Sequence, residues 1–297
     1  MSQLTSWRGL LRREYIEHRL SFIWVPLGIL TLLALAGFSA LMLNRLPRFE
    51  DDLVLPYSLK MFELGYLMLL ALWLAYLAVA MFFFFGEAFH ADRRNNAMLF
   101  WKSMPVSDLK VVVSKFVAGA VLFPLIVLAV GVLSGLVLFL LINLAAFVVP
   151  VVQPIEFGAA VGSFYEVTLF GVVYYALGIA WYAPFFAWVG ALATVFGRWS
   201  LPLAFVVPAL AAVIENVAFF GQGPQGGHIW TYLSSRWAFG LDDDALLQMA
   251  SYAGLFRAQT YLDQLFARID WVQLWIGLGV SAVLIWIASE YRRRRIV

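Results

Sequence analysis

The chain lacks cysteine and has few charged side chains. None of its 297 residues is a cysteine, so disulfides, thiol catalysis and cysteine metal sites are excluded. Charged residues make up only 13% of the chain and hydrophobic residues 63%, which excludes an ordinary water-soluble domain. Intrinsic disorder is also excluded, because it requires low hydrophobicity and high net charge, whereas the mean hydropathy is +0.86 and the net charge +2.

The sparse charges leave long apolar stretches between them. A helix rises about 1.5 Å per residue, so several stretches are long enough to cross a hydrocarbon layer of about 30 Å. We therefore predict an all-α integral membrane protein that forms a single domain, residues 1–297, with six spanning helices. The predicted spans are 22–43, 64–85, 116–142, 167–196, 201–220 and 271–289. Beyond Asn143 the chain carries Pro150 and Pro154, so we interpret this stretch as a loop or a partly re-entrant segment.

Basic residues are concentrated on one side of the predicted spans. The segments 1–21, 86–115, 197–200 and 290–297 carry most of the lysine and arginine, while the opposite side is richer in aspartate and glutamate. The positive-inside rule then predicts that both termini are cytoplasmic, in agreement with the even number of spans. The expected location is the cytoplasmic (inner) membrane, with several passes.

Two flanking segments have amphipathic patterns. Residues 1–21 alternate apolar and basic positions as in a helix that lies on the cytoplasmic membrane interface, although the segment could instead be a charged leader that only sets topology. The external loop, 221–270, begins with a glycine-rich turn and continues with helical periodicity after Asp242. We expect this large helical loop to form a lid above an exit.

The cytoplasmic segment 88–110 joins the second and third predicted spans. Charged and aromatic residues recur there at helical spacing, Pro105 is expected to end that helix, and Ser107 to cap the next one. Such a helix fits a groove on a soluble partner protein. The alternative is a surface helix that only connects two spans.

This segment carries a resemblance to a known family. Its sequence, DRRNNAMLFWKSMPVSDLKVVVSKF, resembles the connection between helices two and three of type-2 ABC transporter permeases, the six-helix membrane subunits of ABC exporters. The six-helix plan, the amphipathic leader and the large last external loop are similar as well. The resemblance implies that 1–21 is an elbow helix and that 88–110 contains the coupling helix that contacts the ATPase. The implied ATPase-coupling residues are Glu87, Asp92, Arg93, Arg94, Phe100, Trp101 and Lys102.

The resemblance also implies partners. These are two copies of a soluble ABC ATPase subunit and a second permease copy, with a homodimer expected, all within or against the lipid bilayer. The chain itself has no Gly-x-x-x-x-Gly-Lys-Ser/Thr phosphate loop, so ATP and Mg²⁺ would be bound by the partner ATPase. We find no catalytic constellation, no metal-site spacing among the three histidines, and no charge excess that indicates a nucleic-acid partner. We therefore expect a transport subunit that is not an enzyme and binds no cofactor directly.

Candidates for the transport path are Glu215, Asn216, Tyr174 and Tyr175. Glu215 is the one ionisable residue inside a predicted span, and an intramembrane carboxylate is a candidate functional site. The alternative is that Glu215 is structural and pairs with Asn216 or with a donor in the external loop. The two tyrosines could contact an amphipathic substrate, but helix packing and aromatic belts explain them equally well.

The expected function is therefore the membrane-spanning permease subunit of an ATP-driven ABC exporter, in which ATPase closure opens a path between two six-helix bundles. A self-contained secondary transporter or channel without an ATPase partner is the alternative. Secondary transporters and channels typically have charged residues near the bilayer midplane, and many transporters contain an inverted repeat. In this sequence only Glu215 fits this pattern. The sequence does not identify the substrate.

Overall fold

The computed structural model describes residues 3–43, 58–94, 107–149, 152–220, 227–237, 239–241, 244–245, 249 and 254–295. These residues form helices joined by short turns and extended segments, and no strand occurs among them. The all-helical prediction is confirmed for this part of the chain.

The helices follow one another in an order that matches most of the predicted spans. They are α1 (Gln3–Arg19), η1 (Leu20–Trp24), α2 (Val25–Met42), α3 (Ser58–Arg94), α5 (Asp108–Val117), η3 (Ala118–Leu122), α6 (Phe123–Val148), α7 (Phe157–Phe196), η4 (Gly197–Trp199), α8 (Ser200–Glu215), η5 (Asn216–Phe220), α9 (His228–Trp237), α11 (Ala258–Arg268) and α12 (Trp271–Arg295). Three of them, η1, η3 and η5, are single π-helical turns.

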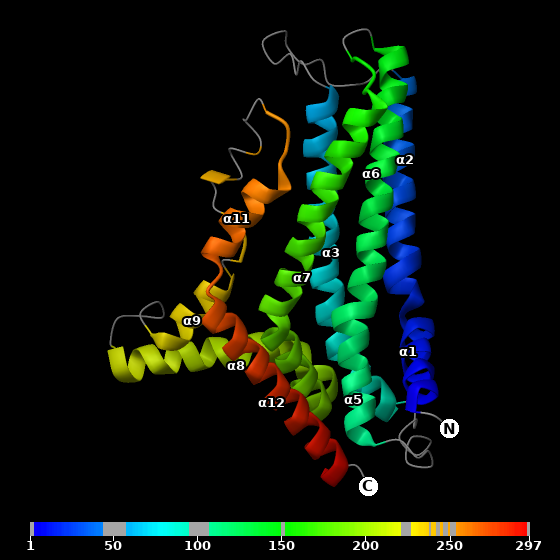
Figure 1. Cartoon of the computed structure of the whole chain (residues 1–297). Coiled ribbons are helices and arrows are strands. Elements are labelled where there is room, and N and C mark those ends of the chain that lie inside the picture. The colour runs from blue at the N-terminus through cyan, green and yellow to red at the C-terminus, as the bar shows by residue number, and fades with distance from the viewer. Residues whose placement is uncertain are drawn as a thin grey trace.

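Helices α2, α3, α6 and α7 run side by side and form an elongated bundle (Figure 1). Small residues allow close packing: a Cβ added at Gly135 of α6 would lie 2.7 Å from the ring of Tyr66 in α3. The buried Trp73 of α3 donates its indole N–H to Ser134 of α6 at 3.3 Å. The core is thus formed where apolar runs from different parts of the sequence meet.

Five helical segments in the described part of the chain are long and apolar enough to cross a membrane. They are Trp7–Met42, Ser58–Ala88, Leu109–Val148, Phe157–Phe219 and Trp271–Arg294. Large apolar side chains are exposed on their outer surfaces, for example Met68, which is 73% exposed. Because lipid tails solvate such side chains as well as a protein core does, this arrangement indicates a multi-pass membrane protein.

The prediction of six spans is not confirmed, because the described part of the chain contains five candidate spans. The fourth and fifth predicted spans, 167–196 and 201–220, fall within one helical stretch, Phe157–Phe219, which turns at Gly197. Gly197 has a φ of 58°, a conformation that glycine adopts without a Cβ clash, so the chain changes direction there. As a result α8 runs across the direction of α3, α6 and α7 (Figure 1).

Several predicted boundaries also change. Within the predicted leader, 1–21, residues Gln3–Arg19 form α1, which continues without a break through η1 into α2. The stretch after Asn143, interpreted as loop or re-entrant, remains helical to Val148, and α7 begins ten residues before the predicted start at 167. The segment predicted as an external loop, 221–270, contains two described helices, α9 and α11, and α9 begins directly after the predicted glycine-rich turn.

The helix cap predicted at Ser107 is confirmed. Ser107 accepts a hydrogen bond from the Lys110 backbone N–H at 3.3 Å, and α5 begins at Asp108. Residues 95–106 lie outside the described part of the chain. At one end of the bundle lie the start of α1, the end of α3, the start of α5 and the end of α12 (Figure 1). We call this the termini end.

Candidate functional site

An apolar cavity of about 280 Å³ lies between α3, α7 and the segment that precedes α11. Its lining residues are Leu67, Leu70, Ala71 and Leu74 of α3, Phe170, Gly171, Tyr174 and Tyr175 of α7, and Phe239, Gly240, Leu241 and Met249. Ligand cavities in proteins are typically apolar and aromatic with a few polar groups, and this lining has that composition. It is the larger of two cavities that we describe.

The two tyrosines predicted for a transport path both line this cavity. Tyr175 is buried, and its hydroxyl donates a hydrogen bond to the Leu70 carbonyl oxygen at 2.7 Å, so α7 is tied to α3 at the cavity wall. Tyr174 lies beneath Gly240, whose φ of 135° places its backbone so close that an added Cβ would lie 2.6 Å from the Tyr174 hydroxyl. The loop backbone therefore closes directly over α7.

Phe239, Gly240, Leu241 and Met249 form one wall of the cavity, which we call the loop-side wall. Phe239 is its central residue. Its ring packs against three aromatic rings of α7, with centroid distances of 5.2 Å to Tyr174, 6.0 Å to Trp181 and 6.0 Å to Tyr182. Gly178 makes room for this ring because it has no side chain: a Cβ at this position would lie 3.3 Å from the Phe239 ring. Phe239 thus closes one side of the cavity.

Arg236, at the end of α9, fixes this wall in place. Its guanidinium is fully buried and donates to the carbonyl oxygens of Trp181 in α7, at 2.9 Å, and of Gln273 in α12. Its cation lies 4.4 Å from the centre of the Trp181 ring, and the Trp181 indole N–H donates to the Arg236 carbonyl oxygen at 2.8 Å. Within the described part of the chain no carboxylate pairs with Arg236, so backbone carbonyls and aromatic rings stabilise this cation.

Two carboxylates hold the other part of the loop. Glu63 of α3 is fully buried and accepts hydrogen bonds from the Ser163 hydroxyl, at 2.6 Å, and from the Phe256 backbone N–H, at 3.1 Å. Glu166 of α7 accepts from the Ala258 backbone N–H at 2.7 Å, at the start of α11. Both carboxylates therefore anchor the chain that enters α11 against the bundle.

Glu215 and Asn216 are not among the residues that line the cavity. The Glu215 carboxylate accepts hydrogen bonds from the backbone N–H groups of His228, at 3.1 Å, and Ile229, at 2.8 Å. These are donors in the first turn of α9, where unpaired N–H groups and the helix dipole favour an anion. Asn216 is buried and donates to the Ala212 carbonyl oxygen at 3.0 Å. These contacts match the structural interpretation of Glu215, in which a loop donor pairs with it.

A second cluster of charged residues lies at the termini end. Lys115 of α5 and Glu14 of α1 are both buried, and the Lys115 Nζ lies 3.0 Å from Glu14 Oε1. A buried ion pair of this kind replaces lost hydration with a direct charge contact. It joins the predicted elbow helix to the helix that follows the predicted coupling segment.

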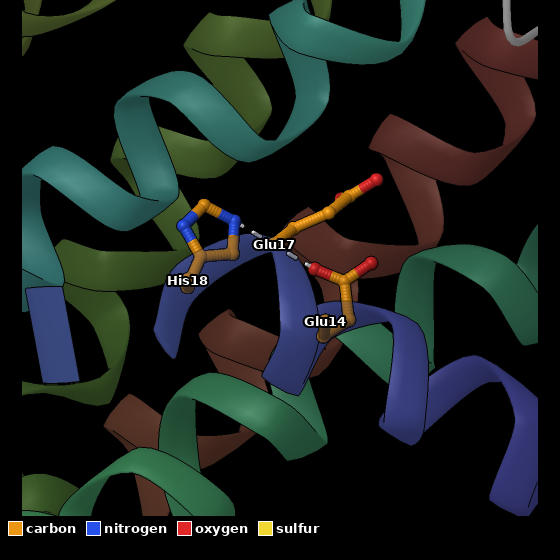
Figure 2. A group of neighbouring side chains, drawn as sticks. All are labelled: Glu14, Glu17 and His18. Carbon is orange, nitrogen blue, oxygen red and sulfur yellow. Dashed lines mark ion pairs between the residues drawn. The ribbon is translucent and has the colours of Figure 1, made fainter. Parts of the chain in front are cut away.

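Glu14, Glu17 and His18 bring three possible metal ligands within 4.8 Å of one another (Figure 2). All three side chains come from α1. Glu14 is neutralised by Lys115, and Glu17 accepts from the Arg13 side chain at 2.8 Å, while His18 lies 4.0 Å from Glu14. Ion pairing accounts for this arrangement without a metal ion.

The predicted ATPase-coupling residues are placed only in part. Glu87 is exposed and, together with His18, lines a second cavity of about 260 Å³ between α1, η1 and α3. Asp92, Arg93 and Arg94 lie in the last turn of α3, at the termini end, and only their backbone is described. Phe100, Trp101 and Lys102 lie outside the described residues.

Sequence reasoning missed four residues that the structure makes prominent. Glu63 directly precedes the predicted span at 64, so it counted as external, although its helical spacing from Tyr66 and Leu70 would place it on the buried face of α3. Arg236 was assigned to the predicted external loop. The apolar residues beside it in the sequence were the only indication that it could be buried. Glu14 and Lys115 are 101 positions apart in the sequence, so no local pattern could pair them.

Comparisons of the chain with models of known protein families, with curated proteins and with solved structures found no match.

Proposed function

We propose that this protein is the membrane-spanning subunit of an ATP-driven ABC exporter. In this proposal two copies pair in the membrane, each with six spans and cytoplasmic termini, and two soluble ATPase subunits bind at the termini end. The fifth span of this plan corresponds to α8 and η5, which here run across α3, α6 and α7, so the proposal requires α8 to reorient at the Gly197 turn within that assembly. The support is the resemblance of residues 92–116 to the helix two to three connection of type-2 permeases, together with the contacts at the termini end.

The observation that carries the proposal is the buried ion pair between Glu14 and Lys115. The predicted coupling segment, 88–110, ends within α5, and Lys115 lies one turn beyond it on the same helix. A force on the coupling segment is therefore transmitted to α1 through a buried charge contact. It also reaches α12, which packs against α5.

These contacts suggest how the subunit would respond to its motor. Closure of the ATPase pair would push the α3–α5 connection, and α1, α5 and α12 would move with it as one unit. Because α12 also packs along α7, this motion would tilt the bundle beside the apolar cavity. The chain itself would hydrolyse no ATP and would only convert the movement of a partner into the opening of a path.

The test measures ATPase activity in lipid nanodiscs with the ATPase that is expressed alongside the protein. We expect stable co-purification and stimulated ATP hydrolysis. Glu14→Lys or Lys115→Glu alone should abolish the stimulation, and the double charge swap should restore it, because the pair is again opposite in sign. Arg198→Glu, an exposed charge at the turn from α7 to α8, is the matched control and should have little effect. Failure of the unmodified protein to bind or stimulate the ATPase contradicts the proposal.

A secondary transporter remains the second candidate, because one observation favours it. Glu63 is a fully buried carboxylate in a candidate span, and such groups often carry protons or ions. However, its oxygens already accept two hydrogen bonds and lie 3.6 Å from Lys60, which is a structural arrangement. Transport into proteoliposomes that is driven by an ion gradient, without ATPase or ATP, would favour this candidate over the exporter.

A further inference from the structure

We propose that the cavity between α3, α7, residues 239–241 and Met249 binds the hydrocarbon chain of an amphiphilic molecule. That this amphiphile is the transported substrate rests on the proposed exporter function. The chain-binding site itself does not require the ATPase. The two statements can therefore fail separately.

The chemistry of the lining selects an uncharged, apolar ligand. No charged side chain is among the described residues that line the cavity. One of its two hydroxyls, on Tyr175, already donates to the Leu70 carbonyl oxygen. A charged or strongly polar group would lose its hydration there without gaining partners, whereas methylene groups lose nothing. Apolar cavities also exclude water, so an apolar ligand displaces no bound solvent.

The shape and location of the cavity favour a slender chain. At about 280 Å³ it lies at the lower end of the range for ligand pockets and has no room for a peptide helix. Both helices that form it belong to candidate membrane spans, and Ala71, which lines it, is exposed on α3 next to the exposed Leu72. Hydrocarbon chains are the most abundant apolar molecules at such a surface.

The loop-side wall is built to remain in place while the cavity is occupied. Phe239 and Gly240 close over Tyr174, and Arg236 binds the backbone of α7 and α12 only three residues before Phe239. The wall therefore depends on contacts outside the cavity. A chain in the cavity therefore leaves the Arg236 contacts that hold the wall intact.

Photolabelling of the purified protein in nanodiscs, without any ATPase, tests the site. The probes are a fatty acid and a long-chain alcohol of equal length, each with an alkyl diazirine near the chain end. We expect both probes to label residues of the lining, as mapped by mass spectrometry of proteolytic fragments. Labelling by the acid alone, or labelling spread evenly over exposed span residues, overturns the proposal.

A matched pair of variants sharpens the test. Ala71→Phe places a ring at the cavity, whereas Ala75→Phe adds the same ring one turn further along α3, at an exposed position outside the lining. Excluding about two methylene groups should reduce apparent probe affinity about tenfold in Ala71→Phe. Ala75→Phe should label like the unmodified protein. If Ala71→Phe does not fold, Leu67→Phe fills the same cavity from the neighbouring turn.

The outcomes separate the two proposals. Labelling that both phenylalanine variants leave unchanged contradicts the cavity as the binding site. Labelling of the cavity by a protein that neither binds nor stimulates an ATPase supports the chain site and contradicts the exporter. Stimulation of the ATPase without any cavity labelling supports the exporter and contradicts the chain site.

Discussion

The carboxylates at the termini end and those that hold the segment between α8 and α12 are used in different ways. At the termini end, Glu14 pairs with the side chain of Lys115, so one helix is joined to another by two charges. Around the loop, Glu63, Glu166 and Glu215 accept hydrogen bonds from backbone N–H groups of Phe256, Ala258 and the first turn of α9. The first arrangement requires two specific residues, while the second requires one specific residue and any loop backbone of the right shape.

This difference indicates which residues can be substituted without loss of the contact and which cannot. A helix pair joined by opposite charges moves as one body, which suits a region that receives force. A loop held through its backbone tolerates changes of its own side chains while the anchoring carboxylates stay. The following predictions test this comparison by removing one member of each kind of contact.

Lys115→Met should have the largest effect. It leaves the buried Glu14 carboxylate without its cation, and breaking a buried ion pair in this way costs roughly 3–5 kcal/mol. The free energy of unfolding in mixed detergent micelles measures the loss. The double variant Glu14→Leu with Lys115→Met should recover most of it, because neither member of this pair then leaves the other as an uncompensated buried charge. A loss below about 1 kcal/mol for Lys115→Met would show that the pair does not join the two helices.

Glu63→Ala should destabilise the fold by roughly 2–3 kcal/mol, because it leaves the Ser163 hydroxyl and the Phe256 N–H buried without their acceptor. Faster hydrogen exchange at the Phe256 amide would locate the effect in the loop. The control is Leu255→Ala, on the loop side, where an exposed side chain is removed and the backbone donors stay. We expect that control to change stability by less than about 0.5 kcal/mol. Equal losses for both variants would remove the distinction between the two kinds of anchor.

Glu215→Gln should reduce stability by about 0.5–2 kcal/mol, the usual range for loss of a helix cap, because the carboxylate at the start of α9 loses its charge. If Glu215 is structural, transport and assembly should both be retained. Transport assays in proteoliposomes with the ATPase check this result. Loss of transport by a correctly assembled variant would instead place Glu215 on the transport path.

Glu17→Ala should have the smallest effect, a loss of about 0.3–0.5 kcal/mol. Glu17 pairs with Arg13 one turn away on the same helix, and the pair is partly exposed. The same unfolding measurement used for Lys115→Met applies. A loss comparable to that of the buried pair would mean that charge at the termini end matters regardless of burial.

Local sequence features predicted the helices well. Apolar runs placed α2, α3, α6, α7 and α12, and Ser107 was correctly expected to cap the helix that begins at Asp108. These features depend on neighbours in the chain. Runs such as 143–148 were misjudged because nearby prolines suggested a break that begins only after Val148.

Features that depend on distant contacts could not be predicted. The turn at Gly197 was seen as a short connection between two spans, but its φ of 58° and the resulting direction of α8 are properties of the folded chain. Tyr174 and Tyr175 were selected from the sequence as candidates for the transport path, but Phe239, which packs against Tyr174, lies far along the sequence. The position of Arg236 was missed because an arginine in a predicted external loop normally faces water.

The π-helical turns η1 and η3 set the rotational phase of the termini end. A π turn carries an extra residue relative to an α turn, and each residue turns an α-helix by about 100°. α1 contacts η3, and Phe22 within η1 stacks on Phe123 directly after η3, with ring centroids 4.0 Å apart. Deleting one residue from either turn would rotate Glu14 or Lys115 away from its partner. In residues 20–24 and 118–122 the number of residues is therefore more constrained than their identity.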